Sequence, residues 1–384
     1  MNADNSPLLS IIIPTKNRYE TLVPVINTLL KNINSNDFEI IIQDNSDSNL
    51  TVLNYFETLQ DQRLRYFYQP ESLSISDNTT QAIEKIRGKY AIFIGDDDLV
   101  SPHICEIVKK LDSVNGVGLI YTPANYWWES VDFQNENFYY QKKALWIPKN
   151  ISTKFVLKKA GEELDFVLKK GAIGYYHLPR FYHGIVLTSA LEKIRKQIGT
   201  YLSGSCPDIA LATSLSFVVE NYYFVNYPVS VFGACRNSGG GWTMSKSHHG
   251  KIAEQKFLQN GIEERWDPNI PLIWSERTIY PQTVFETLKA FKSDRQINYP
   301  AFYASMLANE RFLFKYWWPA VKSYCKKNSA DYLKIMAKYL RISTGVHVDR
   351  LKKRTRSFGY QVVPNQSIDD CMKTLQKLQF SKKA

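Results

Sequence analysis

Apolar runs alternate with amphipathic segments along the first 121 residues of the chain. Five runs are rich in apolar and aromatic residues and have the length of strands, at 8–13, 38–43, 64–69, 90–95 and 117–121. Several of the segments between them place apolar residues at helical spacing, as in 20–33. Continuous apolar strands separated by helices are typical of a parallel sheet covered on both faces. The alternation therefore predicts a doubly wound, mostly parallel α/β unit.

This rhythm changes after residue 121. Residues 122–182 are rich in aromatic and amide side chains, which suits a substrate-facing insertion or a small hairpin. Further helices and short strands are predicted at 151–171, 183–199, 207–219 and 222–234. Beyond about residue 240 the spacing is mostly helical. We therefore predict an α/β domain over 1–240, with halves 8–121 and 122–240, followed by a helical region over 241–384.

The charge of the chain is concentrated at its end. The whole sequence has 48 Lys plus Arg and 37 Asp plus Glu, a net charge of +11, but residues 310–384 alone hold 17 basic and 5 acidic residues.

The composition, with 44% apolar residues, excludes a disordered or collagen-like chain. No apolar run approaches the ~20 residues of a membrane-spanning helix. The start lacks a basic secretory signal, and the five scattered cysteines suit a reducing cytosol, so we expect a cytoplasmic protein.

Acidic residues follow two of the predicted strands. Asp44 comes at the end of the second strand, the triplet Asp96–Asp98 follows the fourth, and Asp208 precedes a later helix. Ligands of open α/β sheets bind outside the carboxyl ends of the strands. Adjacent carboxylates attract a hard divalent cation such as Mg²⁺ or Mn²⁺, which shares its ligands with phosphate oxygens. The alternative is that the triplet Asp96–Asp98 is a solvated acidic turn. The position of the triplet directly after a buried strand favours a ligand-binding site instead.

Two common nucleotide-binding motifs are missing from the sequence. It contains no G-x-x-x-x-G-K-[ST], and no G-x-G-x-x-G follows the first strand, where 14–18 reads PTKNR. The glycine-rich stretch at 238–241 could form a mobile lid or a plain linker.

Three segments resemble the nucleotide-binding half of the family 2 glycosyltransferases, which have the GT-A fold. They are SIIIPTKNRYETL, IIIQDNSDSN and GKYAIFIGDDDLVSP, and the similarity covers about residues 8–121, with a looser match to about 241. The resemblance implies a Rossmann-like sheet. It also implies an enzyme that moves a sugar, with inversion, from a nucleotide-diphosphate donor such as a UDP-sugar to an acceptor hydroxyl.

The resemblance further implies residues that hold the donor. Pro14, Thr15 and Asp44 would hold the nucleoside, and Asp44 would accept from N3–H of uracil. Asp97 would lie near the ribose. Arg236, beside the glycine-rich stretch, could meet the diphosphate.

Metal and acceptor residues follow from the same resemblance. Asp96 and Asp98 would be the acids of the DXD motif, with Asp98 as the direct metal ligand, and His248 or His249 could complete the metal shell. His183 could line the acceptor site, or be a structural histidine.

Asp208 matches the position of the general base that removes the proton of the acceptor hydroxyl. It follows Pro207, whereas the family often has Glu before this acid, so Glu220 is kept as a rival base. Gly95 also replaces an acid that many members carry.

The basic end of the chain predicts an anionic partner. In 331–342 one side is apolar and the other carries Lys334, Lys338 and Arg341, and Trp317 and Trp318 lie upstream. Basic amphipathic helices with interfacial aromatics bind anionic membranes. There the enzyme would reach a polyprenyl-linked or glycan acceptor. The alternative is that the aromatic side chains pack on the catalytic domain. No RNP-like motif predicts nucleic-acid binding. A catalytically silent GT-A-like module that binds anionic polymer is the alternative function.

Overall fold

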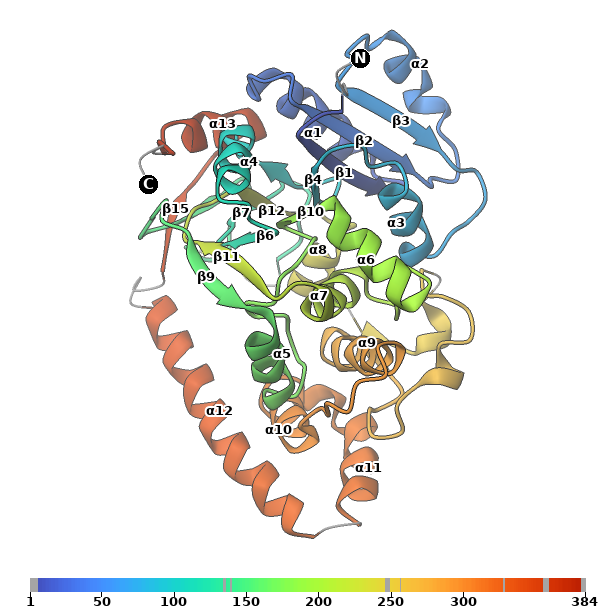
Figure 1. Ribbon diagram of the computed structural model, residues 1–384. Coiled ribbons are helices and arrows are strands. Elements are labelled where there is room, and N and C mark those ends of the chain that lie inside the picture. The colour runs from blue at the N-terminus through green and yellow to red at the C-terminus, as the bar shows by residue number, and fades with distance from the viewer. Residues whose placement is uncertain are drawn as a thin grey trace.

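The computed structural model describes residues 6–133, 136–138, 140–245, 249–255, 257–326, 329–354 and 359–380. An eight-stranded sheet in the order β3-β2-β1-β4-β10-β6-β11-β9 forms its centre (Figure 1). Its strands are β1 (Leu9–Thr15), β2 (Phe38–Asp44), β3 (Leu64–Tyr68), β4 (Tyr90–Phe93), β6 (Gly118–Tyr121), β9 (Val156–Lys159), β10 (Gly184–Leu187) and β11 (Asn221–Val225).

Helices cover both faces of this sheet, as the continuous apolar strands predict. Residues of β1 alternate between two hydrophobic clusters, because Ile11 packs in one and Ile12 in the other. The helices before residue 245 are α1 (Tyr19–Asn32), α2 (Leu50–Thr58), α3 (Ile75–Ile83), α4 (Ile104–Ser113), α5 (Ala160–Lys169), α6 (Thr188–Ile198), α7 (Pro207–Val218) and α8 (Gly239–Met244). The predicted fold class is confirmed: β1 to β4 pair in parallel, and β10 enters antiparallel between β4 and β6.

A second sheet has the order β15-β8-β7-β12-β5. It consists of β5 (Leu99–Val100), β7 (Ala124–Trp127), β8 (Leu145–Pro148), β12 (Ser230–Ala234) and β15 (Tyr360–Val363). The short pair β13 (His249–Gly250) and β14 (Trp274–Ser275) lies apart from it. The remaining helices are α9 (Glu276–Ala290), α10 (Tyr299–Asn309), α11 (Phe314–Cys325), α12 (Ala330–Arg354) and α13 (Ile368–Gln376), so the part after 240 is mostly helical.

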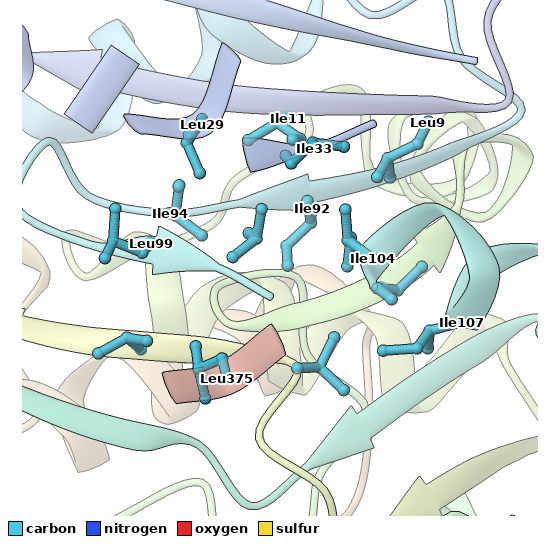
Figure 2. Packing of buried hydrophobic residues seen from close by; sticks show 14 of the residues in the cluster. Leu9, Ile11, Leu29, Ile33, Ile92, Ile94, Leu99, Ile104, Ile107 and Leu375 are labelled. Carbon is cyan, nitrogen blue, oxygen red and sulfur yellow. The ribbon is translucent and has the colours of Figure 1, made fainter. Parts of the chain in front are cut away.

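The end of the chain, within the region predicted at 241–384, returns to the N-terminal core. β15 pairs antiparallel with β8, and α13 lies against α1 (Figure 1). Cys371, Met372 and Leu375 of α13 are fully buried in the same cluster as Ile11. Figure 2 shows Leu375 among the residues of this cluster. The apolar positions of α13 recur at helical spacing, and a capping box at Ser367 and Asp370 begins the helix.

The helical part before residue 355 has its own apolar cluster around α10, α11 and α12. Trp317 is fully buried in it, and Trp318 packs against it. The expectation that both tryptophans lie at a membrane interface is therefore wrong for Trp317. Within the described ranges, no helix has the length and apolar character that crossing a membrane requires.

Candidate functional site

The carboxyl ends of β1, β2 and β4 bring the sequence-predicted residues to one edge of the sheet. Thr15 pairs with Asp44 in the register of β1 and β2, and the loop Gly95–Asp98 follows β4 directly. Pro14 lies in the same strand end and is partly buried. This edge is where ligands of open α/β sheets bind.

Asp96 is held by residues of the first strand and the loop after it. Its Oδ2 accepts from Thr15 Oγ1 at 2.6 Å and from Arg18 Nε at 3.0 Å. Arg18 Nη2 lies 2.8 Å from Oδ1, so the pair is two-pronged. Burial raises the pKa of the Asp96 carboxyl to about 7, although the charge of Arg18 opposes the rise.

Asp98 is surrounded by hydrogen-bond donors. Its Oδ2 accepts from the Gly95 amide at 2.6 Å, His183 Nε2 at 2.7 Å and Tyr182 O–H at 3.1 Å. Its Oδ1 accepts from the Gly233 amide at 2.6 Å. Despite its burial, these partners, His183 first, lower the pKa of the Asp98 carboxyl. Asp98 therefore ties its own loop to β10 and β12.

His183 lies behind Asp98 and has no exposed surface. Nδ1 of its ring is 2.6 Å from Ser230 Oγ, and the ring stacks on Phe232 with centroids 3.5 Å apart. Its φ of 48° lies in the left-handed region, which is uncommon for a residue with a side chain. This position does not fit the expected contact with an acceptor, and it makes His183 a positioning residue for Asp98.

Asp97 connects the acidic loop to the glycine-rich segment. Its Oδ2 accepts from the Cys235 amide at 3.1 Å, and its carbonyl accepts from Trp128 Nε1 at 2.8 Å. The approach is so close that a Cβ at Gly233 would lie 1.7 Å from the Asp97 carbonyl oxygen. Residues 239–244, for which a lid or a linker was expected, form the helix α8, and Ser238 caps it.

Asp44 also has its partners inside the protein. Tyr19 and Tyr66 each donate an O–H to Oδ2 at 2.7 Å, and the Ser46 amide donates to Oδ1 at 2.9 Å. The residue has no exposed surface. Its predicted contact with uracil stays a prediction.

Asp208 lies at the second position of α7 and is partly buried. Burial, and to a smaller extent the charge of Asp98, raise the pKa of its carboxyl from 3.8 to about 7. Burial, and after it the charges of Asp98 and Asp208, raise the pKa of Tyr182, which donates a hydrogen bond to Asp98. Asp208 therefore lies close enough to the acidic loop for the charge of Asp98 to act on it, and its proton affinity suits a general base near neutral pH.

Glu220 does not share this position. It is exposed and lies just beyond the opposite end of α7, about 18 Å from Asp208 at 1.5 Å per helical residue. The rival base is therefore excluded by the fold.

Three other predicted residues, Arg236, His248 and His249, have no contact with the acidic loop among the described side chains or lie outside the described residues. The exposed side chain of Arg236 pairs with Asp132 at 3.0 Å. His248 lies outside the described residues, and the exposed His249 has its ring 5.1 Å from that of Phe312. Sequence reasoning missed Arg18 and Tyr182. Arg18 stands in the PTKNR segment after the first strand, and a basic residue in that loop was the available signal.

The residues as arranged do not form a metal shell. Asp98 accepts four donors, and Asp96 has Arg18 as its cation. Among the described residues, no three His, Cys, Asp or Glu side chains are placed to hold a metal ion together. Asp98 is thus engaged by protein donors, whereas Asp96 Oδ1 is buried with Arg18 Nη2 beside it but without a hydrogen bond, and metal dependence stays a prediction.

Fold and site together define an open α/β protein with an acidic ligand-binding edge. Residues 10–161 match the family model described as Glycosyl transferase family 2. A protein of Escherichia coli (strain K12) named as a colanic acid biosynthesis glycosyl transferase, WcaA, is 33% identical over 99 residues, or 26% of this chain and 36% of that protein. An uncharacterized glycosyltransferase of Haemophilus influenzae is 26% identical over 151 residues, or 39% of this chain and 48% of that protein. The chain thus spans less than half the length of these relatives.

Among solved structures, S. aureus TarS 1-349 in complex with UDP-GlcNAc has a TM-score of 0.51 to this chain. The likeness covers 89% of this chain and 92% of that chain at 12% identity, so it concerns the fold alone. The chain therefore contains a family 2 glycosyltransferase domain, and its fold is the GT-A fold. Both predictions from the sequence are confirmed.

Proposed function

We propose that this protein is an inverting glycosyltransferase that uses a nucleotide-diphosphate sugar, with a UDP-sugar as the preferred candidate. The observation that carries the proposal is Asp208, a partly buried carboxyl in the first turn of α7 whose pKa is raised to about 7 by burial and by the charge of Asp98. The solved structure that shares the fold is in complex with UDP-GlcNAc, which supports a donor of this kind.

In this mechanism Asp208 takes the proton of an acceptor hydroxyl as the oxygen attacks the anomeric carbon of the donor. The new glycosidic bond forms while the bond between the anomeric carbon and the diphosphate oxygen breaks, and the nucleoside diphosphate leaves with the electron pair. Attack from the face opposite the leaving group inverts the configuration. Thr15 and Asp44 lie at the strand ends where the nucleoside is proposed to bind.

The acceptor in this proposal is a hydroxyl of a glycan or of a lipid-linked sugar, in the synthesis of a surface polysaccharide. The name of the E. coli relative, which refers to colanic acid biosynthesis, supports this assignment.

The test combines donor hydrolysis with product analysis. Purified protein is incubated with a panel of nucleotide sugars, and release of the nucleoside diphosphate is measured with and without added glycan acceptors. Proton NMR of the product then gives the anomeric configuration. Turnover with inversion supports the proposal, whereas donor binding without any turnover would favour the silent binding module.

We also propose that α12 binds an anionic membrane surface on the cytoplasmic side. Leu333, Met336, Leu340 and Leu351 of this helix are exposed, and the basic Lys334 and Arg341 lie among them. An exposed apolar row with basic neighbours is the feature of interfacial helices. Truncation after residue 345 would not test this, because it also removes β15 and α13 from the core.

A further inference from the structure

The guanidinium of Arg18 is the cation that meets the acidic loop in this structure. Its two-pronged pair with Asp96 joins Nε to Oδ2 at 3.0 Å and Nη2 to Oδ1 at 2.8 Å. The Asp96 side chain is 0% exposed, whereas the Arg18 side chain is 21% exposed. The carboxylate is therefore sealed from solvent, and the Arg18 side chain that covers it is partly exposed at the carboxyl ends of the strands.

Arg18 has hydrogen-bonding capacity that its pair with Asp96 does not use. A guanidinium has five N–H donors, and one of them, Nε–H, makes a hydrogen bond to Asp96, whereas Nη2 lies 2.8 Å from Oδ1 as an ion pair without a hydrogen bond. In the part of the chain that the structure describes, the Arg18 side chain makes no further hydrogen bond, so the N–H groups of both terminal nitrogens remain. Arg18 is thus a fixed, partly exposed fork, which is the geometry that binds phosphate oxygens bidentately.

The other charges of the site make Arg18 the natural partner of an anion. Asp97 adds a second buried carboxylate close to the guanidinium, and the pair of acids would repel a diphosphate if no cation lay between. Asp98 does not need a cation, because its donors come from the Gly95 and Gly233 amides, Tyr182 and His183.

We propose that Arg18 binds the diphosphate of the nucleotide donor, and that Asp96 acts by orienting Arg18. This inference rests on the proposed function, because the diphosphate is the charged part of that donor. Arg18 then meets the negative charge that develops on the leaving group, which is the position where a fixed cation stabilises the transition state most. Asp96 is a positioning residue in this scheme, and the chain's own side chain supplies the positive charge that its acidic motif was expected to take from a metal ion.

Calorimetry with two ligands tests the assignment. UDP and uridine are titrated into wild-type protein and into Arg18→Gln, each in EDTA and in Mn²⁺. We expect wild-type protein to bind UDP in EDTA, and Arg18→Gln to bind UDP about 10- to 100-fold more weakly, the usual effect of losing a hydrogen-bonded charge. Uridine affinity should stay within about threefold, because uridine has no phosphate. Arg18→Lys keeps the charge without the fork and should fall between the two proteins.

Arg65→Gln is the matched control. Arg65 Nη1 pairs with Glu39 at 2.8 Å, and these side chains are 18% and 6% exposed, close to the values of the Arg18 pair. Both residues lie near the amino ends of β3 and β2, away from the proposed site. Thermal unfolding of this variant should show how much such an ion pair contributes to folding. Its ratio of UDP affinity to uridine affinity should equal that of the wild type.

Three outcomes would overturn the inference. They are an Arg18→Gln protein that binds UDP as tightly as the wild type, one that loses UDP and uridine affinity equally, and wild-type binding of UDP that disappears in EDTA. All three leave the proposed function intact. If the wild-type protein binds no nucleoside diphosphate from a panel of UDP, GDP and ADP, the proposed function fails and the inference fails with it.

Discussion

Replacing Asp208 by Asn removes the proposed base with almost no change in volume. The structure indicates that the ionised carboxylate is costly, since burial and the charge of Asp98 raise its pKa from 3.8 to about 7. We expect Asp208→Asn to fold, to bind the donor, and to lose about 10²- to 10⁴-fold in turnover, the range for general acid–base groups.

The pH dependence follows from the same pKa. A base is active when ionised, so kcat/KM of the wild-type enzyme should rise about tenfold per pH unit below pH 7 and level off above it. The free energy of unfolding should instead fall as the pH rises. The folded state holds this proton more tightly than the unfolded state, so the contribution of Asp208 to stability is complete below pH 4 and is lost as pH rises through about 7, by at most about 4 kcal/mol. Asp208→Asn should therefore be more stable than the wild type at pH 8 while it is less active.

The assay measures transfer and urea unfolding from pH 5.5 to 8.5 for wild type, Asp208→Asn and the control Glu220→Gln. Glu220 lies at the far end of α7 and is exposed, so its variant should match the wild type in both measurements. A wild-type rate that does not change with pH, or an Asn variant that keeps the same rise and a turnover within tenfold, would refute the reasoning.

Three further predictions concern other parts of the structure. Leu375→Ala should lower the free energy of unfolding by about 2–5 kcal/mol in urea titrations, because the side chain is fully buried, whereas Leu340→Ala, 63% exposed, should change it by less than about 0.5 kcal/mol; equal effects would remove α13 from the core. His183→Ala should destabilise the fold by about 3–5 kcal/mol, because Asp98 then loses a partner while it stays buried, and a melting temperature like that of the wild type would contradict this role. Lys338→Glu with Arg341→Glu should reduce sedimentation with anionic liposomes at low salt by about 1 kcal/mol of binding free energy for each removed charge; binding that the change leaves intact, or that neutral liposomes match, would argue against the membrane proposal.

The strands β1, β2, β4 and β6 were predictable because they are buried on both faces and are therefore mostly apolar. The runs at 38–43 and 90–95 coincide with β2 and β4 to within a few residues, since their length and flanking polar residues leave little choice. The parallel order of β1 to β4 follows from the helices between them. Local pattern and tertiary structure agree in this half of the chain.

The end of the chain could not be placed in the same way. Residues 359–380 form a short strand and a helix, and no local pattern says which sheet or helix they join. Their partners β8 and α1 lie more than 200 residues earlier in the sequence. The net charge of this region gave no information on where residues 359–380 pack. It reflects the exposed side chains of α12 and does not describe the buried face of α13.

The acids of the site were predictable by type and position, but their surroundings were not. The three aspartates of one loop differ only in their partners: Asp96 faces Arg18, Asp97 faces the Cys235 amide, and Asp98 faces His183. A motif gives the residue types at a strand end, whereas the partners come from β1, β10 and β12, which only the fold brings together.

These partners make the acidic loop depend on distant parts of the chain. Asp98 and Asp97 accept from backbone amides of Gly233 and Cys235, at and just after the end of β12. β12 belongs to the second sheet, which β15 from the end of the chain completes at its far edge. Only a substitution by proline removes a backbone N–H donor, so most side-chain substitutions alter this support only by moving the strand. A loop that must hold three buried carboxylates against their mutual repulsion needs such rigid donors, and the return of the chain's end to the N-terminal core helps to supply them.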